Sequence, residues 1–291
     1  FGVDLNRNWG TDWGNCPVGD ASCGSNSPSS DVYYGTAAFS EPETQRVRDW
    51  VYTRHFTAMI DQHAFGPYYS LPFGRPSLHT MNAEDANFYT RIPAIMGKYN
   101  GMRAGNSPQS VNYEVAGGVK DWMLMGNIGT GTKGKIYGMT GEGGAGGGTP
   151  AFGGVANFWP PASQIVRLCQ GMVYQDIQLA LAAGSYVDIQ DQGNMNVSTR
   201  FGSFDFQVRR IGATNEPVTV SLIPMENVVA AGAPVTINSI STYYGTVNGS
   251  ISYALPWTIQ NGNGQRLKYI WRVQTGGITY DDTITKFYNP V

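Results

Sequence analysis

The sequence is short of charged residues, and those that it has nearly cancel. Lys and Arg number 19 and Asp and Glu 21, for a net charge of −2, and charged residues make up 14% of the 291-residue chain. Nucleic acids and anionic membranes select a basic face, so this balance argues against both as partners. The chain also lacks an apolar run of the roughly 18 residues that a membrane span needs. We therefore expect no nucleic-acid partner and no membrane span.

Cysteine is scarce as well, with three residues and no Cys-x-x-Cys pair, so zinc-ribbon spacing is absent. Cys16 and Cys23 flank the loop CPVGDASC, which predicts a small disulfide, with two unpaired loop thiols as the alternative. Glycine, at 38 residues, and aromatic residues, at 12%, are plentiful. This composition suits a secreted, loop-rich enzyme or adhesin.

The hydrophobic period changes once along the chain, near residues 184–190. Residues 1–184 mix helical patterns with short apolar runs, which predicts an α/β domain. Residues 185–291 alternate apolar and polar residues with a period of two, between Gly, Asn and Pro, which predicts an all-β sandwich. Six strands are expected there, at residues 201–210, 217–225, 233–241, 249–259, 267–275 and 277–288. Two tryptophans of this part, Trp257 and Trp271, could form an exposed surface that stacks on a sugar. We favour the alternative that both pack in the core.

Three helices are expected in the first part, at residues 40–55, 82–101 and 161–184. In the first helix, Ser40 and Glu43 predict a capping box, and Val47, Trp50 and Val51 a buried stripe. In the third, one face carries four residues that we expect to be buried, with a free thiol among them: Ile165, Leu168, Cys169 and Met172. Strands are expected at residues 1–3, 56–61 and 134–142, and a mobile glycine-rich loop at 141–154.

Four polar residues of the first part occupy positions at which chemistry is common. His63 follows one expected strand and Glu142 lies at the end of another, so they are candidates for a metal ligand and a general base. Arg7, in NRN, would bind an anion through two parallel hydrogen bonds, and Tyr113 stands beside a Gly-Gly turn. Each has an ordinary alternative: a structural histidine, a solvated acid, a surface ion pair and a packing aromatic.

Taken in order, seven motifs resemble the zinc carboxypeptidase family of the pancreatic carboxypeptidases A and B. They are GVDLNRNW, DVYYG, SEPET, IDQHAFGPYYSLPFG, NYEVAGGVKDW, GE and PPASQI, and they cover residues 1–183. The resemblance implies a mixed-sheet, hydrolase-like α/β fold followed by the β-sandwich. It also implies a secreted peptide hydrolase that uses Zn²⁺ and removes the C-terminal residue of peptides and proteins.

The resemblance also implies a role for each matching residue. Asn6 and Arg7 match the pair that holds the substrate's C-terminal carboxylate, and His63 matches a zinc ligand. Tyr113 matches a mobile tyrosine that closes over the C-terminal residue, and Glu142 matches the general base that activates water. These roles suit an exopeptidase, because a guanidinium binds a carboxylate through two parallel bonds and a metal acidifies the attacking water.

Lys120 matches the pocket residue that reads the substrate's C-terminal side chain. An ammonium group in that pocket would attract a C-terminal Glu or Asp and repel Lys or Arg. We therefore expect a preference for acidic C-terminal residues. The alternative is that Lys120 reaches solvent or pairs with an acid such as Glu114 and has no effect on specificity.

The chain departs from the family pattern in its metal ligands. Family members take two zinc ligands from an upstream His-x-x-Glu motif, but this chain has three histidines and none is followed by Glu at the third position; the residues there are Ala58, Gly66 and Asn82. A His₂Glu zinc site cannot be built from His63 alone. Phe65, and extra glycine-rich sequence between Glu142 and Pro161, are smaller departures.

We therefore expect the chain to be the C-terminal part of a catalytic domain, with the N-terminal portion of the same enzyme as its partner. That portion should add strands beside residues 2–4. The function expected is that of a secreted or cell-surface zinc metallocarboxypeptidase, of bacterial origin. The alternative is a catalytically inactive, carboxypeptidase-like binding or structural protein of the cell surface.

Overall fold

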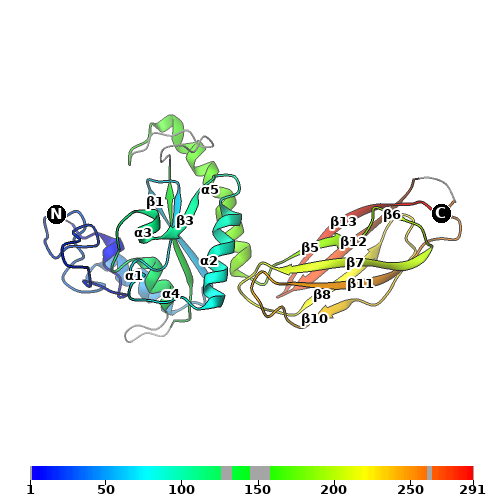
Figure 1. The fold of residues 1–291 in the computed structure, drawn as a ribbon, viewed down its shortest axis with the longest axis horizontal. Helices are drawn as coiled ribbons and strands as arrows, with labels where there is room; N and C mark the ends of the chain where they lie inside the picture. Colours follow the sequence, from blue (N-terminus) through cyan, green and yellow to red (C-terminus); the bar gives the residue numbers. More distant parts are fainter. Residues whose placement is uncertain (1, 126–132, 145–157, 261–263, 291) are drawn as a thin grey trace. The chain divides into compact units, whose positions relative to one another are not determined.

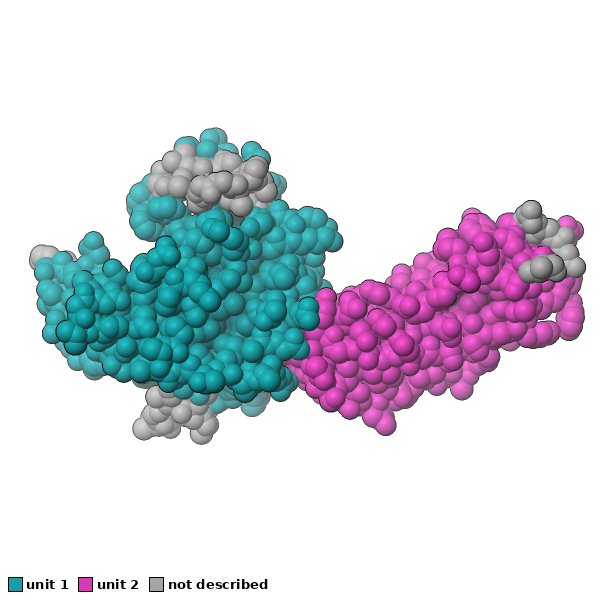
Figure 2. Space-filling view, in the orientation of Figure 1, with its two compact units in different colours: residues 1–183 teal, residues 184–291 magenta. Residues whose placement is uncertain are grey.

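A computed structural model of the chain describes residues 2–125, 133–144, 158–260 and 264–290 (Figure 1). The chain separates into two compact units, Phe1–Ala183 and Gly184–Val291, which Figure 2 shows in different colours. Most of the expected glycine-rich loop lies outside the described residues. No helix in the described ranges combines the length and the apolar character needed to cross a membrane.

Unit 1 is built on a mixed four-stranded sheet, which confirms the expected α/β class. The sheet order is β1-β4-β2-β3, with β1 at Ala58–Ala64, β4 at Tyr137–Gly143, β2 at Tyr68–Leu71 and β3 at Arg103–Asn106. β1 runs parallel to β4, β4 antiparallel to β2, and β2 parallel to β3. Parallel neighbours end at the same edge of a sheet, so the ends of β1 and β4 bring two residues of distant sequence together.

Unit 1 also contains five α-helices and one 3₁₀ helix in its described residues. They are α1 (Pro42–Tyr52), α2 (Ala83–Met96), α3 (Ser107–Ser110), α4 (Val119–Met125) and α5 (Ala162–Ala183), and a short 3₁₀ helix spans Leu5–Arg7. α2 begins at Asn82, whose side chain accepts a hydrogen bond from the Asp85 amide, the usual way of satisfying a free helical N–H. α4 is buried and contributes Trp122, which packs with Trp9 and Ile136 in one apolar cluster.

The predicted capping box of α1 is wrong. The helix begins at Pro42, after Glu41, with no side-chain cap. Ser40 is unavailable because its hydroxyl accepts a hydrogen bond from Asn8 Nδ2 at 2.9 Å and donates to Glu41 Oε1 at 2.7 Å. The predicted buried stripe is also partly wrong: Val51 is buried, whereas Val47 and Trp50 are exposed. A pattern marks which face is apolar, but burial requires a packing partner.

The N-terminal residues do not form the predicted strand. Asp4 instead caps the 3₁₀ helix, accepting a hydrogen bond from the Asn6 amide at 2.9 Å, as Asp side chains do in tight turns. The sheet has two edge strands, β1 and β3, each with one neighbour among the described residues. Residues 2–4 therefore offer no strand for additional strands to pair with, and the edges of the sheet lie at Ala58–Ala64 and Arg103–Asn106. The docking of an N-terminal portion stays a prediction.

The predicted buried face of α5 is wrong in its first half. Ile165 is half-exposed and Cys169 is exposed, so the free thiol is not buried. The buried residues of α5 begin later and are Gly171, Gln175, Leu179 and Ala182. Among the described elements, α5 packs on α2 and β1. The predicted disulfide between Cys16 and Cys23 is present.

Every regular element in the described part of unit 2 is a strand, which confirms the all-β expectation. One sheet has the order β10-β8-β12-β13-β6 and the other β5-β7-β11-β9. The strands are β5 (Val187–Gln192), β6 (Asn196–Val197), β7 (Phe201–Arg210), β8 (Val218–Pro224), β9 (Ala230–Ala231), β10 (Val235–Ile237), β11 (Thr246–Ala254), β12 (Gln265–Thr275) and β13 (Ile278–Tyr288). Alternate residues of both sheets share one core. β6 and β9 were not predicted because they have two residues each, and β5, which begins with alternating residues, was missed.

A buried polar cluster lies inside unit 2. Lys286 Nζ of β13, the last strand, lies 2.7 Å from Asp191 Oδ2 of β5, the first. Tyr269 and Trp271 of β12 both donate hydrogen bonds to Asp191 Oδ1. Trp271 is thus a core residue, as predicted, whereas the prediction fails for Trp257, which is 78% exposed in a turn after β11.

Candidate active site

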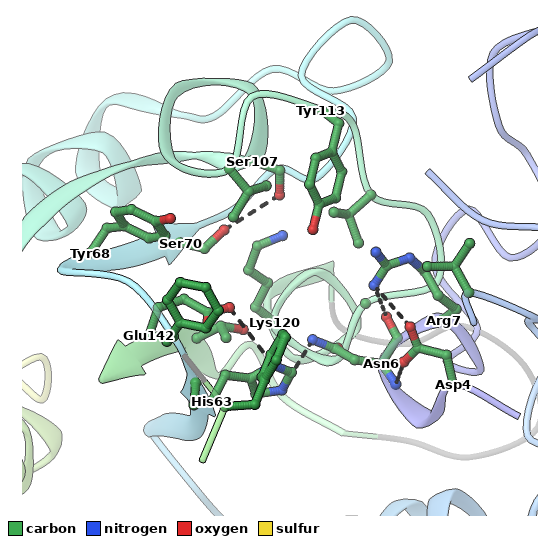
Figure 3. Close-up of a pocket in the computed structure, with 18 residues that line it drawn as sticks. Asp4, Asn6, Arg7, His63, Tyr68, Ser70, Ser107, Tyr113, Lys120 and Glu142 are labelled. Carbon is green, nitrogen blue, oxygen red and sulfur yellow. Dashed lines mark hydrogen bonds and ion pairs between the residues drawn. The ribbon is translucent and has the colours of Figure 1, made fainter. Parts of the chain in front are cut away.

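A cavity of about 460 Å³ opens at the end of the sheet of unit 1 (Figure 3). It brings together all six residues that the sequence singled out, from four separate parts of the chain: Asn6, Arg7, His63, Tyr113, Lys120 and Glu142. Figure 3 shows the side chains of Lys120 and Tyr113 pointing into the same space. Residues that converge on one cavity from such distances in sequence make it the candidate active site.

His63 and Glu142 face each other because β1 and β4 run parallel in register. The two residues are direct partners in the pairing, and His63 Nδ1 lies 3.7 Å from Glu142 Oε1. The other ring nitrogen, Nε2, lies 2.9 Å from Asp61 Oδ2, and Asp61 Oδ1 accepts a hydrogen bond from Thr140 Oγ1 at 2.9 Å. The hydrogen bond to Asp61 raises the pKa of His63, and burial partly opposes it.

Glu142 is a carboxylate in a largely desolvated position. Burial raises its pKa above the usual value, and the charges of His63 and Arg7 partly oppose this increase. A carboxylate with a raised pKa accepts a proton more readily at neutral pH than a solvated one does. The environment of Glu142 therefore suits a general base.

Arg7 is a buried residue of the cavity wall. Its Nε donates to the Cys23 carbonyl at 2.7 Å, Nη2 to the Ser22 carbonyl at 3.3 Å and Nη1 to the Asn6 carbonyl at 3.2 Å. Asp4 Oδ2 lies 3.6 Å from Nη1. A guanidinium has five N–H donors, so these three bonds leave two for an anionic ligand.

Asn6 connects Arg7 to the other side of the cavity. Its Oδ1 accepts a hydrogen bond from the Val119 amide at 2.9 Å, at the start of α4. Its Nδ2 lies 3.4 Å from His63 Nε2. The amide is thus fixed between the 3₁₀ helix, α4 and β1, and presents a polar group to the cavity.

Lys120 lies in the first turn of α4 and is buried. Its Nζ lies 3.3 Å from Asp121 Oδ1, and Asp121 Oδ2 accepts a hydrogen bond from the Gly74 amide at 2.7 Å. Burial raises the pKa of Asp121, which Lys120 opposes. Lys120 does not reach solvent, so that alternative fails. The alternative that Lys120 pairs with an acid is borne out, but the acid is Asp121, because Glu114 Oε2 lies 2.8 Å from Arg75 Nε. The preference for acidic C-terminal residues stays a prediction.

Hydroxyl groups complete the wall near Lys120. Ser70 Oγ lies 3.4 Å from Ser107 Oγ and accepts a hydrogen bond from Ser110 Oγ at 3.2 Å. Ser70, Ser107 and Thr140 line the cavity together with Lys120. Three hydroxyl groups and one ammonium group make this part of the lining polar, which is unsuited to an apolar side chain.

The sequence did not single out Asp61, Thr140, Ser70 or Ser107. For Asp61 a signal existed, because residues two apart on a strand point to the same face, which places it beside His63. For the serines no comparable signal existed, since α3 and β2 meet only in the folded chain.

The described residues do not by themselves fit a zinc site. No group of three or more His, Cys, Asp or Glu side chains in the described part of the chain is arranged to hold a metal ion. His63 provides one nitrogen of the kind that zinc requires, and a catalytic zinc site needs three protein ligands.

Comparison with known proteins identifies the family. A family model described as zinc carboxypeptidase matches residues 1–175, more than half of the chain. The chain belongs to the zinc carboxypeptidase family. It is 30% identical over 126 residues to zinc carboxypeptidase A 1 of Drosophila melanogaster, covering 42% of this chain and 28% of that protein. It is 33% identical over 130 residues to carboxypeptidase B of Helicoverpa zea, covering 42% of this chain and 29% of the relative.

The chain thus spans less than a third of the length of these curated relatives. Among solved structures, bovine thrombin-activatable fibrinolysis inhibitor in complex with tick carboxypeptidase inhibitor is similar, with a TM-score of 0.46 and 21% identity. That match covers 62% of this chain and 56% of the solved one.

Proposed function

We propose that the protein containing this chain is a zinc-dependent metallocarboxypeptidase that removes the C-terminal residue of peptides and proteins. The observation that carries the proposal is the convergence of Arg7, His63 and Glu142 on one cavity. These residues supply a carboxylate-binding cation, a metal-binding imidazole and a partly desolvated base. Membership in the family supports the reaction type.

The residues of this chain would divide the work as follows. Arg7 and Asn6 bind the substrate's terminal carboxylate, which places the last peptide bond near Glu142. Tyr113, about one-third exposed at the rim, closes over the terminal residue. Glu142 accepts a proton from the attacking water and passes it to the leaving amine. In the complete enzyme Zn²⁺ would polarise the scissile carbonyl and acidify the water.

His63 would supply one of the zinc ligands, and the N-terminal portion of the same polypeptide would supply the others. A groove of about 370 Å³ beside β1 supports this partner. Its walls are apolar and include Val47, Trp50, Phe56, Met59 and Ile60. An open strand edge beside exposed apolar side chains favours pairing with a further strand.

Hydrogen exchange tests this partner. Adding the N-terminal portion to the chain should slow exchange of the β1 amides and allow one zinc ion to bind per complex. Strand β13 of unit 2 serves as the internal control, and its exchange should not change. Unaltered exchange in β1 with zinc still bound would contradict the proposed docking.

The catalytic assignment is tested by Glu142→Gln in the complete enzyme. The amide keeps the size of the side chain but cannot accept the proton, so turnover of a blocked dipeptide should fall by about 10²- to 10⁴-fold. Zinc content should stay nearly the same. Equal turnover of the two proteins would reject Glu142 as the base.

A second candidate function is that of an inactive, carboxypeptidase-like binding protein. It is favoured by the missing metal cluster in the described residues and by a match to an inactive metallocarboxypeptidase of Arthroderma otae, 27% identical over 84 residues. A complete protein with neither stoichiometric zinc nor turnover would establish this alternative.

We further propose an extracellular location, which the Cys16–Cys23 disulfide supports, because such bonds persist in oxidising compartments. The relatives from Drosophila melanogaster and Helicoverpa zea lend no support to a bacterial source.

A further inference from the structure

The loop closed by Cys16 and Cys23, here called the disulfide loop, has no role in the function proposed above. Its last two residues nevertheless hold Arg7, because the Cys23 carbonyl accepts from Nε at 2.7 Å and the Ser22 carbonyl accepts from Nη2 at 3.3 Å. These are two of the three backbone carbonyls bonded to the guanidinium. The orientation of the arginine is therefore determined largely by this loop.

The loop has its own means of fixing these two carbonyls. Asp20 Oδ1 accepts hydrogen bonds from the Ser22 amide at 3.0 Å and the Cys23 amide at 3.2 Å. The disulfide joins Cys16 to Cys23, whose side chain is fully buried. The Asp20 side chain and the disulfide bond thus restrain the two peptide groups whose carbonyls bond to Arg7.

Close packing ties the disulfide to the arginine. A Cβ added to Gly24 would lie 3.2 Å from Cys16 Sγ and 3.8 Å from Arg7 Cδ, so the sulfur and the arginine stem border the same glycine. Movement of the disulfide loop would displace the stem as well as the carbonyl acceptors. The two N–H groups left for a ligand would then lose their common direction.

We propose that the disulfide loop is a positioning element for Arg7, so that opening the Cys16–Cys23 bond weakens binding of peptide C-terminal carboxylates. The proposal rests on the function proposed above. The proposal concerns substrate binding and not the proton transfer by Glu142. The loop does not line the cavity, and Glu142 receives no hydrogen bond from it. The disulfide would make substrate affinity depend on the redox state of the surroundings.

The test compares the double variant Cys16→Ser/Cys23→Ser with wild type in the complete enzyme, using a blocked dipeptide with a free C-terminal carboxylate. KM should rise about tenfold, as expected for one weakened charged hydrogen bond, while kcat changes much less. Cys169→Ser, which removes an exposed thiol outside the loop, is the matched control and should leave KM unchanged. Hydrolysis of the C-terminally amidated substrate should not change in either variant.

Arg7→Ala separates failure of this inference from failure of the proposed function. If Arg7→Ala raises KM and the double variant does not, the loop has no positioning role and the inference is overturned. If Arg7→Ala also leaves KM unchanged, the assignment of Arg7 to carboxylate binding fails first.

A second measurement needs no variant and uses the 291-residue chain itself. In the oxidised chain the Arg7 Nε–H is buried and hydrogen-bonded, so it should exchange slowly with solvent by NMR. Reducing the disulfide should accelerate this exchange several-fold and leave that of the buried Arg210 Nε–H, in unit 2, unchanged. Equal protection of the Arg7 Nε–H before and after reduction would overturn the proposal.

Discussion

Replacing Lys120 tests how the cavity selects its substrate. Lys120 Nζ is buried and lies 3.3 Å from Asp121 Oδ1, so the ammonium is partly neutralised before any substrate arrives. A substrate ending in Glu would bring a second carboxylate to the ammonium. A substrate ending in Lys would bring a like charge to the same place.

The size of the preference for Glu over Lys is estimated from Coulomb's law. Two unit charges about 4 Å apart interact by about 4 kcal/mol at an effective dielectric constant of about 20. Asp121, 3.3 Å from the same ammonium, reduces this interaction for both substrates, which have opposite signs of charge. The preference for Glu over Lys should then be about 2 to 4 kcal/mol, or roughly 30- to 1,000-fold in kcat/KM.

The variant must be designed around Asp121. Lys120→Met alone leaves a buried carboxylate without its cation, which costs about 3–5 kcal/mol when the partner charge persists. Because burial already raises the pKa of Asp121, part of this cost is relieved when the group takes up a proton. Lys120→Met/Asp121→Asn is the matched control, since the Asn Oδ1 still accepts the Gly74 amide bond.

The assay uses blocked dipeptides ending in Glu, Lys, Phe or Leu with the complete enzyme. Wild type should favour Glu, and Lys120→Met and the double variant should bring the Glu and Lys substrates to within about tenfold of each other. Lys120→Asp should favour Lys. Equal cleavage of the Glu and Lys substrates by wild type would refute the reasoning, and so would an unchanged preference in Lys120→Asp.

Two further predictions concern stability and pH. Asp191→Ala should lower the free energy of unfolding of unit 2, measured in urea, by about 3–5 kcal/mol, because it leaves the Lys286 ammonium buried without its counter-charge. A decrease below about 1 kcal/mol would show that the polar cluster does not stabilise the unit. Burial lowers the pKa of Lys133 from 10.5 to about 8, so the folded protein releases this proton before the unfolded chain does. The free energy of unfolding should therefore rise between about pH 8 and 10.5, and Lys133→Met should abolish this part of the rise. A titration midpoint of Lys133 Nζ at the ordinary lysine value would contradict this prediction.

Local elements of the fold were predictable because their signals are local. Asn82 begins α2, Gly184 follows the end of α5, and the alternation of residues 201–210 matches β7 in full. The Cys16–Cys23 disulfide follows from two cysteines seven residues apart. Capping, periodicity and short loops are properties of neighbouring residues, so the chain carries them in its sequence.

The sequence by itself determined which residues gather at the cavity, because the motifs identify the family and with it Arg7, His63 and Glu142. Only the tertiary structure decided which apolar faces are covered. Val47, Trp50 and Ile165 have the right spacing for burial and are exposed, since burial depends on an element that packs against them. The tertiary structure also decided that Lys120 pairs with Asp121 and that Ser22 and Cys23 hold Arg7, since contacts between distant segments depend on where the backbone brings them.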